Sequence, residues 1–538
     1  MQEHHWDIAN VRPLHIYFAA LAIAMAILTS GCRVGPDYCR PPSSPVADSY
    51  PAASVDEADV LHAPLDGADH PGTGEAQGDV DPFESDPAGE LTPELVSWWT
   101  ALNDPVLNEF VVCAVKNNRD LRVAAERILE SRARRGTVAS SLFPQVDTDG
   151  SFTHEKRPSG GMFGGTVRDW WSWGTDLSWE IDVFGRLRRL LEAADADIGE
   201  QRELYRDTLI LLIAETAHTY VEARSHQEQM AIVAANINVQ AETVRLVRSR
   251  YNNDKADMLD VSQAEGSLKG VEAGYPPFRI LYRQSINRLS VLIGCPPGAV
   301  DAQMSQPRPI PNAPEHVAVG IPAELLRRRP DIRSAERKIA AQTSRIGAAV
   351  GELYPQFSII GTFGLEANDF SALWNSNSIG AGVTPAMRWH ILNFGRYRSN
   401  VRVQESLQRQ YIWEYENTVL RAAEEVDNAL VGFDQGKQRG KLLQKSVDNY
   451  VEAVRLSQIK YRAGHVDLQR VLDSQRSQLV SQNLLVLNRT EVVQSFISLY
   501  RALGGGWQLP VQRIATMTTG IAEGQPELIP LPPPTGQP

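Results

Sequence analysis

The chain has 538 residues, a formal net charge of -12 and a pI near 5.5, and this acidity argues against nucleic acid as a partner. Its four cysteines form no CxxC pair and its eleven histidines form no HExxH motif, so the sequence predicts no metal site, no redox site and no cofactor. The length leaves ample material for a hydrophobic core.

The N-terminus carries a predicted targeting segment. Residues 16–30 form an apolar run that suits a signal peptide but is short for a membrane-spanning helix. Small residues then precede Cys32, an order that resembles a bacterial lipoprotein signal and implies cleavage before Cys32 and acylation of its thiol. Thr29 stands where leucine is usual, and Arg12 is the only Lys or Arg before the run. An ordinary secretory signal is the alternative, and either signal takes the mature chain out of the cytoplasm.

Two regions have the composition of segments that form no core. Residues 41–94 hold thirteen Asp or Glu and no Lys or Arg, and the last thirty-one residues are rich in proline. Such stretches bury too little apolar surface to offset their chain entropy, so we expect both to be disordered or draped over the surface. The predicted parts are a signal peptide (1–31), an acylated N-terminus with an acidic linker (32–94), repeat 1 (95–300), a linker (301–320), repeat 2 (321–507) and a tail (508–538).

Four segments alternate apolar and polar residues with the period of two that is typical of strands. They are residues 146–155, 171–182, 357–366 and 379–391, joined in pairs by loops at 158–165 and 368–378. In 171–182 one face is largely aromatic and the other carries acidic side chains, whereas Pro385 is unusual for a strand interior. If the chain crosses a membrane, it must do so as strands of a closed barrel, and four strands cannot close one alone. Closure therefore predicts an oligomer; a small soluble sheet with one wet face is the alternative.

One motif occurs twice. WEIDVFGRLRR at 179–189 is repeated as WHILNFGRYRS at 389–399, which is 210 residues later, and this distance indicates duplication of a half-protein. After each copy a helix of about 66 residues is predicted, from Gly185 to Tyr251 and from Gly395 to Tyr461, which would reach roughly 100 Å.

Each long helix carries a stripe with a 4-3-4-3 spacing, which predicts coiled-coil packing. The first stripe contains Leu209, Ile213, Thr216, Tyr220 and Ala223, and the second contains Val419, Ala423, Val426, Leu430 and Phe433.

The rest of each half is predicted to be helical. After a tight turn, a return helix of about 36 residues runs to Gly294 in the first half and to Gly504 in the second. Shorter helices are predicted over 119–142 and 330–352, and each could stack end to end with a return helix. The predicted fold class is therefore mainly α with β: a long coiled-coil part plus four strands per subunit, with an internal two-fold repeat.

Several motifs resemble the TolC-like outer membrane factor family, in particular its lipoprotein-type, NodT-like efflux subfamily. They are VGPDYCRPP after Cys32, the paired helix starts NNRDLRVAAERI (117–128) and RRRPDIRSAERKI (327–339), LFPQV and LYPQF before the first strand of each half, FGR after the second strand, and LYRALGGGW at 499–507. The resemblance covers roughly residues 28–507.

The resemblance implies a homotrimer whose twelve strands form one outer membrane β-barrel and whose helices form a tunnel through the periplasm. It implies a lipid-anchored exit duct of a tripartite efflux pump that passes small toxic compounds outward, working with a periplasmic adaptor protein and a proton-driven inner membrane transporter. Such a duct needs no catalytic residue, so no enzyme activity is expected.

The resemblance also implies a periplasmic gate at the turns. Asp473 matches a family position whose acid faces the pore, where three copies would hold cations. Arg470 stands at another position that is often acidic, so a second acidic ring is not expected. Tyr461 and Asp260 match a pair that links neighbouring coils, and a Tyr hydroxyl donating to a carboxylate contributes on the order of 1.5–3 kcal/mol. The alternative for Asp473 is a solvated helix residue.

The tips of the two turns, about 252–260 and 463–469, are the predicted contacts of the adaptor; the alternative is that they are merely exposed loops. The contact residues are Asp254, Lys255, Ala256, Gly464, His465 and Val466. Asp254 replaces the glycine that is usual in the family, and we expect it to adopt the left-handed conformation that Asp tolerates.

Three functions other than an efflux duct are considered, of which the scaffold and the hydrolase differ from it in class. A periplasmic coiled-coil scaffold lipoprotein would have no use for strands with one aromatic and one acidic face. An exit duct of a protein secretion system would share the same fold. A hydrolase is disfavoured because Ser151 and His154 fall on opposite faces of their strand.

Overall fold

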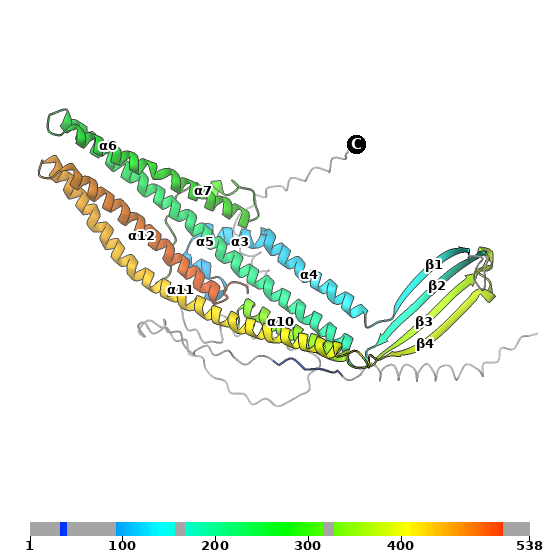
Figure 1. Ribbon diagram of the computed structural model, residues 1–538. Helices are drawn as coiled ribbons and strands as arrows, with labels where there is room; N and C mark the ends of the chain where they lie inside the picture. The colour runs from blue at the N-terminus through cyan, green and yellow to red at the C-terminus, as the bar shows by residue number, and fades with distance from the viewer. Residues whose placement is uncertain (1–32, 40–92, 157–166, 316–327, 509–538) are drawn as a thin grey trace, which may run out of the picture. The chain divides into compact units, whose positions relative to one another are not determined.

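The computed structural model describes residues 33–39, 93–156, 167–315 and 328–508 (Figure 1). The predicted signal peptide, Cys32, nearly all of the acidic linker, the loop 158–165 and the tail after Gln508 lie outside the described residues. The helices and strands are α2 (Pro93–Val96), η3 (Trp98–Leu102), α3 (Pro105–Asn117), α4 (Arg119–Ser140), β1 (Gln145–Lys156), β2 (Val167–Ile181), α5 (Arg186–Tyr251), α6 (Met258–Ala273), α7 (Tyr275–Leu292), α8 (Asp301–Met304), α10 (Pro330–Gly351), β3 (Gln356–Ala367), η4 (Phe370–Ala372), η5 (Ser376–Ser378), β4 (Ile379–Arg388), α11 (Arg396–Arg462) and α12 (Leu468–Ala502).

The chain forms two compact units, and each unit takes segments from both repeats. The first contains β1 to β4, α10, α4 from Asp120, α5 as far as Asp207 and α11 as far as Glu424. The second contains α2, η3, α3, α6, α7, α8, α12 and the remaining parts of α5 and α11. Because the two long helices each belong to both units, the compact units do not coincide with the two repeats.

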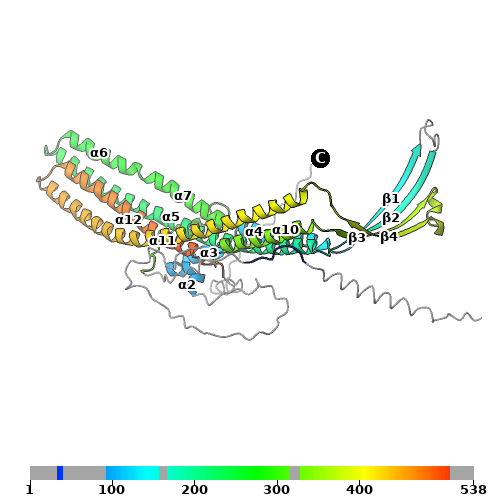
Figure 2. The same ribbon diagram turned by 60° about the horizontal axis from the view of Figure 1, so that its bottom comes forward.

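The four predicted strands are confirmed and form one antiparallel sheet in the order β1-β2-β3-β4 (Figure 2). The last strand ends at Arg388 rather than at residue 391. Pro385 lies within β4, which is an edge strand of this sheet, where a missing N–H group is tolerated. The outer edges of β1 and β4 therefore have no strand neighbour among the described residues.

The register places one continuous apolar face across all four strands. Cross-strand pairing holds the Phe152 and Trp171 rings 4.5 Å apart, centroid to centroid. The members of this face include Val146, Phe152, Trp171, Trp173, Leu177, Trp179, Ile359, Phe363, Leu365, Ile379, Val383 and Met387. The opposite face carries Asp147, Asp149, Asp176, Glu180 and Glu366. The predicted separation of an aromatic from an acidic face is thus present in the sheet.

The repeated tryptophan has the same partner in both halves. Trp179 Nε1 donates a hydrogen bond to the carbonyl oxygen of Leu142 (3.0 Å), and Trp389 Nε1 donates to that of Leu353 (3.1 Å). Each leucine begins the LFPQ or LYPQ motif that precedes the first strand of its half. The tryptophan therefore ties the end of the second strand to the entry of the first, which explains why it occurs twice.

The glycine of each FGR motif makes the transition from strand to helix. Gly185 has φ +78° and Gly395 has φ +88°, a left-handed conformation that glycine adopts without steric cost. In the first half the following arginine is paired as well, since Arg186 Nη2 lies 2.8 Å from a carboxylate oxygen of Glu180. The motif thus turns the chain out of β2 and into α5.

The two long helices are present with nearly the predicted bounds. In α5 every residue of the predicted stripe is buried, as are Ile210, Ala217 and Val221 beside it, so this helix is packed on more than one side. In α11 the prediction is wrong at two positions: Ala422 and Ala429 are buried, whereas Ala423 and Leu430 are only half-buried. No helix among the described residues is both long and apolar enough to cross a bilayer.

The return helices differ between the halves. The second is the single helix α12, as predicted, but the first is divided into α6 and α7 at Gly274. The cause lies in Pro276 and Pro277, which lack the N–H groups that would continue the hydrogen bonding of α6. At the far end of α7, Asn118 Nδ2 donates to the carbonyl oxygen of Leu292 (2.9 Å). This contact, within the second unit, joins the end of α7 to the residue between α3 and α4.

Three short helices that the sequence pattern did not reveal lie before α4. Asp104 caps α3 by accepting a hydrogen bond from Val106 N (2.9 Å), and its second carboxylate oxygen accepts one from the Tyr220 hydroxyl (2.5 Å). Arg224 Nε donates to the same hydroxyl at 3.0 Å. The stripe residue Tyr220 therefore fixes the start of α3 to α5 in the core of the second unit.

We predict that Trp179→Phe destabilises the chain by about 1 kcal/mol, because the ring is kept while the hydrogen bond to Leu142 is lost. Denaturant unfolding of the purified protein measures this change. Trp173→Phe is the matched control, since Trp173 lies on the same face of β2 and its indole makes no hydrogen bond among the described residues. Equal destabilisation by both substitutions would contradict the role assigned to the repeated tryptophan.

Candidate functional site

The two turns that follow the long helices are built alike. In the first, Asp254 N donates to Tyr251 O (3.0 Å) and Lys255 N donates to Arg250 O (2.9 Å). In the second, 210 residues later, Gly464 and His465 donate to the equivalent carbonyls of Tyr461 and Lys460 at the same distances. Both turns need one residue with a left-handed backbone.

The left-handed position is occupied by Asp254 in the first turn and by Gly464 in the second. Their φ angles are +57° and +79°, so the expectation that Asp254 adopts this conformation is confirmed. An Asp at this position costs more than a glycine but less than most other residues. The departure from the family pattern therefore leaves the geometry of the turn intact.

Behind the turns, residues from four helices form a small hydrophobic cluster, which we call the tip cluster. Its buried members are Val244, Val247, Val261, Ala264, Tyr461, Leu468 and Val471, with Leu246, Leu268, Val466 and Leu472 packed against them. The tip cluster joins the hairpin of the first repeat to that of the second, because Val247 and Val261 come from one and Tyr461 and Leu468 from the other.

Arg250 spans the two hairpins at this cluster. Its guanidinium carbon lies 4.6 Å from the centroid of the Tyr461 ring, and Nη1 donates a hydrogen bond to the Tyr461 carbonyl oxygen. A second nitrogen, Nη2, donates to Lys255 O at 3.4 Å. This cation–π contact was not predicted, because it joins residues 211 positions apart in the sequence.

Tyr461 and Asp260 lie close to one another, but no hydrogen bond joins them. The Tyr461 hydroxyl is buried and has no hydrogen-bond partner among the described residues. Burial raises the pKa of Tyr461, the negative charge of Asp260 raises it further, and Arg250 opposes both effects. The hydroxyl therefore stays protonated at physiological pH, and the latch between Tyr461 and Asp260 stays a prediction.

The other predicted gate residues lie on the surface of the first turns of α12. Asp473 is exposed and accepts a hydrogen bond from Gln469 Nε2 (3.0 Å). Arg470 is also exposed, one helical turn before Asp473. The predicted adaptor contacts are mostly exposed too: Asp254, Lys255, Gly464 and His465 fully, and Ala256 and Val466 in part.

Ser151 and His154, the residues that a hydrolase would have to bring together, lie on opposite faces of β1, as expected. Ser151 Oγ lies 2.8 Å from Ser172 Oγ on one face, while His154 contacts Asp169 on the other. No nucleophile and base meet at this site. What the sheet offers instead is an exposed apolar face, with Phe363 44% and Val383 75% accessible.

The comparisons with known proteins agree with this geometry. Residues 111–295 and 321–505, one segment in each repeat, match the family model described as outer membrane efflux protein. Together they make up more than half of the chain. The chain therefore belongs to the outer membrane efflux protein family.

Individual relatives match over nearly their whole length. Nodulation protein T of Rhizobium leguminosarum bv. trifolii is 29% identical over 485 residues, which cover 90% of this chain and 96% of the relative. The toluene efflux pump outer membrane protein TtgF of Pseudomonas putida is 28% identical over 491 residues, with the same coverage. The solved structure of the outer-membrane channel OprN is 29% identical, has a TM-score of 0.75 and covers 89% of this chain and 100% of its own.

These matches confirm the predicted resemblance, the mainly helical fold with a small sheet, the location in the outer membrane and the function as an efflux channel with a helical periplasmic part. The family is one of channel proteins. The roles of the individual gate, tip and lipidation residues stay predictions.

We predict that Arg250→Ala loosens the tip. It removes the cation–π contact and two hydrogen bonds to carbonyl oxygens, and a loss of about 1–2 kcal/mol speeds local opening roughly 5–30-fold. Hydrogen exchange of residues 254–258 and 463–468, followed by mass spectrometry, measures this change. Arg248→Ala is the control, because within the described part of the chain the Arg248 side chain forms only an exposed pair with Glu265. Equal exchange in both variants would contradict the role of Arg250.

Proposed function

We propose that three copies of this chain form the outer membrane exit duct of a tripartite efflux pump. The duct passes small toxic compounds outward, receiving them through a periplasmic adaptor protein from a proton-driven inner membrane transporter. Cys32 carries the lipid that anchors each copy in the outer membrane. The trimer is supported by a difference between the two repeats. Their sequence patterns are alike, but equivalent apolar side chains are buried in the first repeat and exposed in the second.

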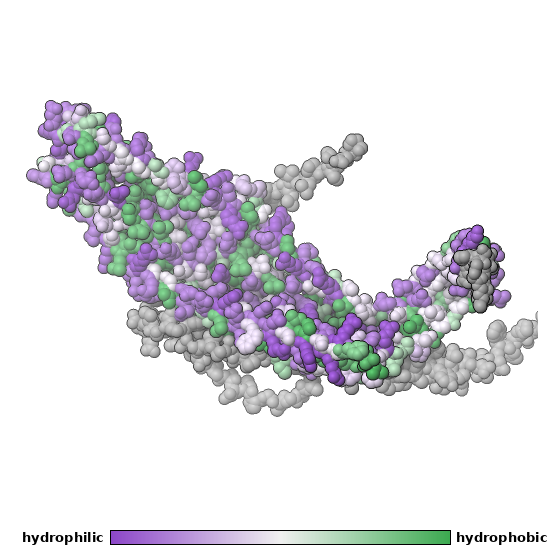
Figure 3. All heavy atoms as spheres, in the orientation of Figure 1, coloured by the Kyte–Doolittle hydropathy of each residue, from purple (hydrophilic) through white to green (hydrophobic). Residues whose placement is uncertain are grey.

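Three apolar residues that are buried in α5 have exposed equivalents in α11. Ala193 is 3% accessible, whereas Val403, its equivalent 210 residues later, is 53% accessible. Two further pairs behave in the same way: Ile210 (3%) with Leu420 (55%), and Val221 (0%) with Val431 (45%). Patches of apolar residues also interrupt the hydrophilic surface of the helices in Figure 3.

The helices that cover α5 come from the second repeat of the same chain, and α11 has no equivalent cover among the described residues. In the second unit, α5 contacts α12, for example through the hydrogen bond between Thr490 and Ser225 at 2.8 Å. In the first unit, α10 packs so closely on α5 that a Cβ on Gly347 would lie 2.9 Å from Arg189 Nε. A second copy that offers its α4 and α7 to α11 would repeat both contacts and cover the exposed residues.

The aromatic residues at the junctions of strand and helix show the same inequality. Phe184 stacks on Tyr354 with centroids 4.7 Å apart. Their repeat equivalents are Phe394, which is 94% accessible, and Phe143, which is 65% accessible. If copies follow one another around a ring, Phe394 of each copy meets Phe143 of the next, and the open edge of β4 meets that of β1. Three copies then bring together twelve strands.

The apolar face of the sheet supports a membrane position for the strands. Side chains that are exposed on one copy, such as Val383 and Met387, would contact lipid, while the acidic face lines water. In this arrangement α5 and α11 leave the membrane, and the turns at their far ends form the gate and the adaptor contacts. Asp473 of three copies would face the pore there, and Tyr461 and Asp260 would restrain neighbouring coils.

We predict that a chain with both Phe394→Cys and Phe143→Cys is crosslinked into a covalent trimer by a short reagent that joins two thiols. In the ring, Cys at position 394 of each copy would react with Cys at position 143 of the next, so all three copies would become linked. Electrophoresis in SDS reads out the mass. The background carries serine at the exposed or half-buried native cysteines, Cys39, Cys113 and Cys295.

The matched control is Phe184→Cys with Tyr354→Cys, which joins the equivalent residues within one chain and leaves the monomer mass unchanged. Intermolecular products that stop at the dimer, or none at all, would contradict the ring of three.

We predict that Asp473→Ala weakens block of the channel current by trivalent cations at least about tenfold, which corresponds to 1.4 kcal/mol. Planar bilayer recordings of the purified protein measure the blocking concentration. Asp448→Ala is the control, because Asp448 on α11 accepts the same kind of hydrogen bond, from Gln444 at 2.9 Å, away from the tip. Unchanged block in Asp473→Ala would remove this residue from the pore.

A further inference from the structure

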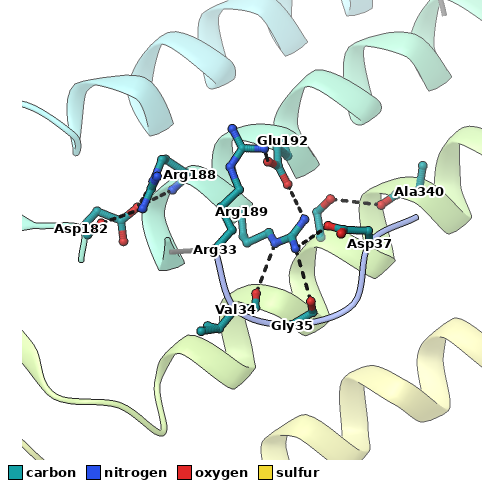
Figure 4. A network of polar contacts seen from close by, with 10 residues as sticks. Arg33, Val34, Gly35, Asp37, Asp182, Arg188, Arg189, Glu192 and Ala340 are labelled. Atoms are coloured by element: carbon teal, nitrogen blue, oxygen red, sulfur yellow. Dashed lines mark hydrogen bonds and ion pairs between the residues drawn. The ribbon is translucent and has the colours of Figure 1, made fainter. Parts of the chain in front are cut away.

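Residues 33–39, which follow the predicted acylated cysteine, lie against the helices of the first unit (Figure 4). We call this segment the strap. Val34 N donates a hydrogen bond to Phe184 O (3.3 Å), so the strap begins beside the FGR motif. Arg33 Nη1 lies 2.5 Å from Glu192 Oε1. The strap therefore meets the chain where β2 leads into α5.

Three hydrogen bonds from Arg189 of α5 bind the strap (Figure 4). Nε donates to Val34 O (3.3 Å), and Nη2 donates to Gly35 O (3.4 Å) and to the Asp37 carboxylate (2.7 Å). Nη1 donates to Glu192 at 2.9 Å. The Arg189 side chain is only 6% accessible. A buried guanidinium whose N–H groups reach main-chain oxygens and two carboxylates forms a built site rather than a chance surface contact.

Glycines let the strap come this close. Gly35 has φ +96°, and a Cβ built on it would lie 2.4 Å from the Cα of Gly347 on α10. Gly185 faces Arg33 in the same way, since its Cβ would lie 3.0 Å from the Arg33 Cα. Any larger residue at Gly35 would be strained by its backbone and would clash with α10. Both the shape and the charge of the site therefore match this strap.

Comparison of the two repeats shows that the charged residues of the site, Arg189 and Glu192, occur in the first repeat alone. Arg186 and Arg188 have arginine equivalents 210 residues later. In contrast, the position of Arg189 holds Ser399 in the second repeat, and the position of Glu192 holds Arg402, with the opposite charge. The two charged residues that bind the strap therefore differ between the repeats, whereas Phe184 and Gly185 recur as Phe394 and Gly395. The Arg189–Glu192 pair is present in one repeat of each chain, which matches the single N-terminal strap of the chain.

We propose that Arg189 and Glu192, with the close contacts that Gly185 and Gly347 allow, form a docking site for the strap that fixes the acylated end of the chain at the junction of sheet and helix. Arg33 directly follows Cys32, and consecutive Cα atoms are about 3.8 Å apart, so docking of Arg33 fixes the point from which the acyl chains extend. The inference rests on the proposed lipidation of Cys32 and deepens it. It assigns to the VGPD motif the role of a ligand for α5 and α10.

The test uses the native Cys39, which is exposed at the end of the strap, as the site of a nitroxide spin label. The full-length mature protein in detergent carries Cys113→Ser and Cys295→Ser so that Cys39 is the free thiol. In Arg189→Ala we expect the rotational correlation time of the label to fall about threefold or more, because the strap is released. Gly35→Val leaves Arg189 in place and should release the strap to the same degree.

Arg402→Ala is the matched control, since Arg402 is the repeat equivalent of Glu192 and has no strap to hold. It should leave the spectrum unchanged. A label that is already mobile in the parent protein, or that keeps its mobility in both Arg189→Ala and Gly35→Val, overturns the docking site.

Mass spectrometry of the labelled parent separates this outcome from a failure of the proposed lipidation. One nitroxide per chain together with the mass of the lipid supports acylation of Cys32, whereas a second nitroxide on Cys32 shows that acylation is absent. In the latter case Cys32→Ser restores a single label, and the docking of the strap is tested on its own. An immobile label in that variant supports the docking site without the lipid.

Discussion

A sheet of four strands with two open edges cannot separate lipid from water. Its edge strands leave rows of backbone N–H and C=O groups that must be paired before they can enter a bilayer. The sheet of this chain has an apolar face on all four strands, and both of its edges are unpaired among the described residues. A duct can exist only when the edges of β1 and β4 are paired, so the proposed function depends on how these two edges are closed.

The internal repeat supplies the rule for closure. Where the first repeat meets the second inside one chain, Ala193, Ile210 and Val221 of α5 are buried and Phe184 is stacked on Tyr354. In the second repeat the equivalent residues of α11 are exposed, and Phe394 has no ring against it in the described chain. Repetition of one contact, first within a chain and then between chains, produces a ring in which every junction is alike. The strap marks the exception, because Arg189 and Glu192 break the repeat at the place where the single N-terminus docks.

Much of this fold could be predicted from the sequence. The strands could be predicted because alternation with a period of two places Trp171 and Trp173 on one face. The long helices could be predicted because apolar residues recur with an average spacing of 3.5 residues along each of them. Prediction failed where neighbouring residues are chemically alike: Ala422 and Ala423 fit the stripe equally well, and only packing selects the former. The break at Gly274 could have been expected from the two prolines that follow it.

The contacts of Arg250 with Tyr461 and of Arg189 with the strap were beyond reach, because they join segments more than 150 residues apart. Only a comparison of the two repeats, which sets Arg189 against Ser399, carries a trace of the second contact in the sequence. Whether the chain forms a conduit is measured as the current through a planar bilayer that contains the purified full-length protein. A conduit gives stable, discrete conductance steps; a protein that inserts as single copies and passes no current would show that the chain forms none.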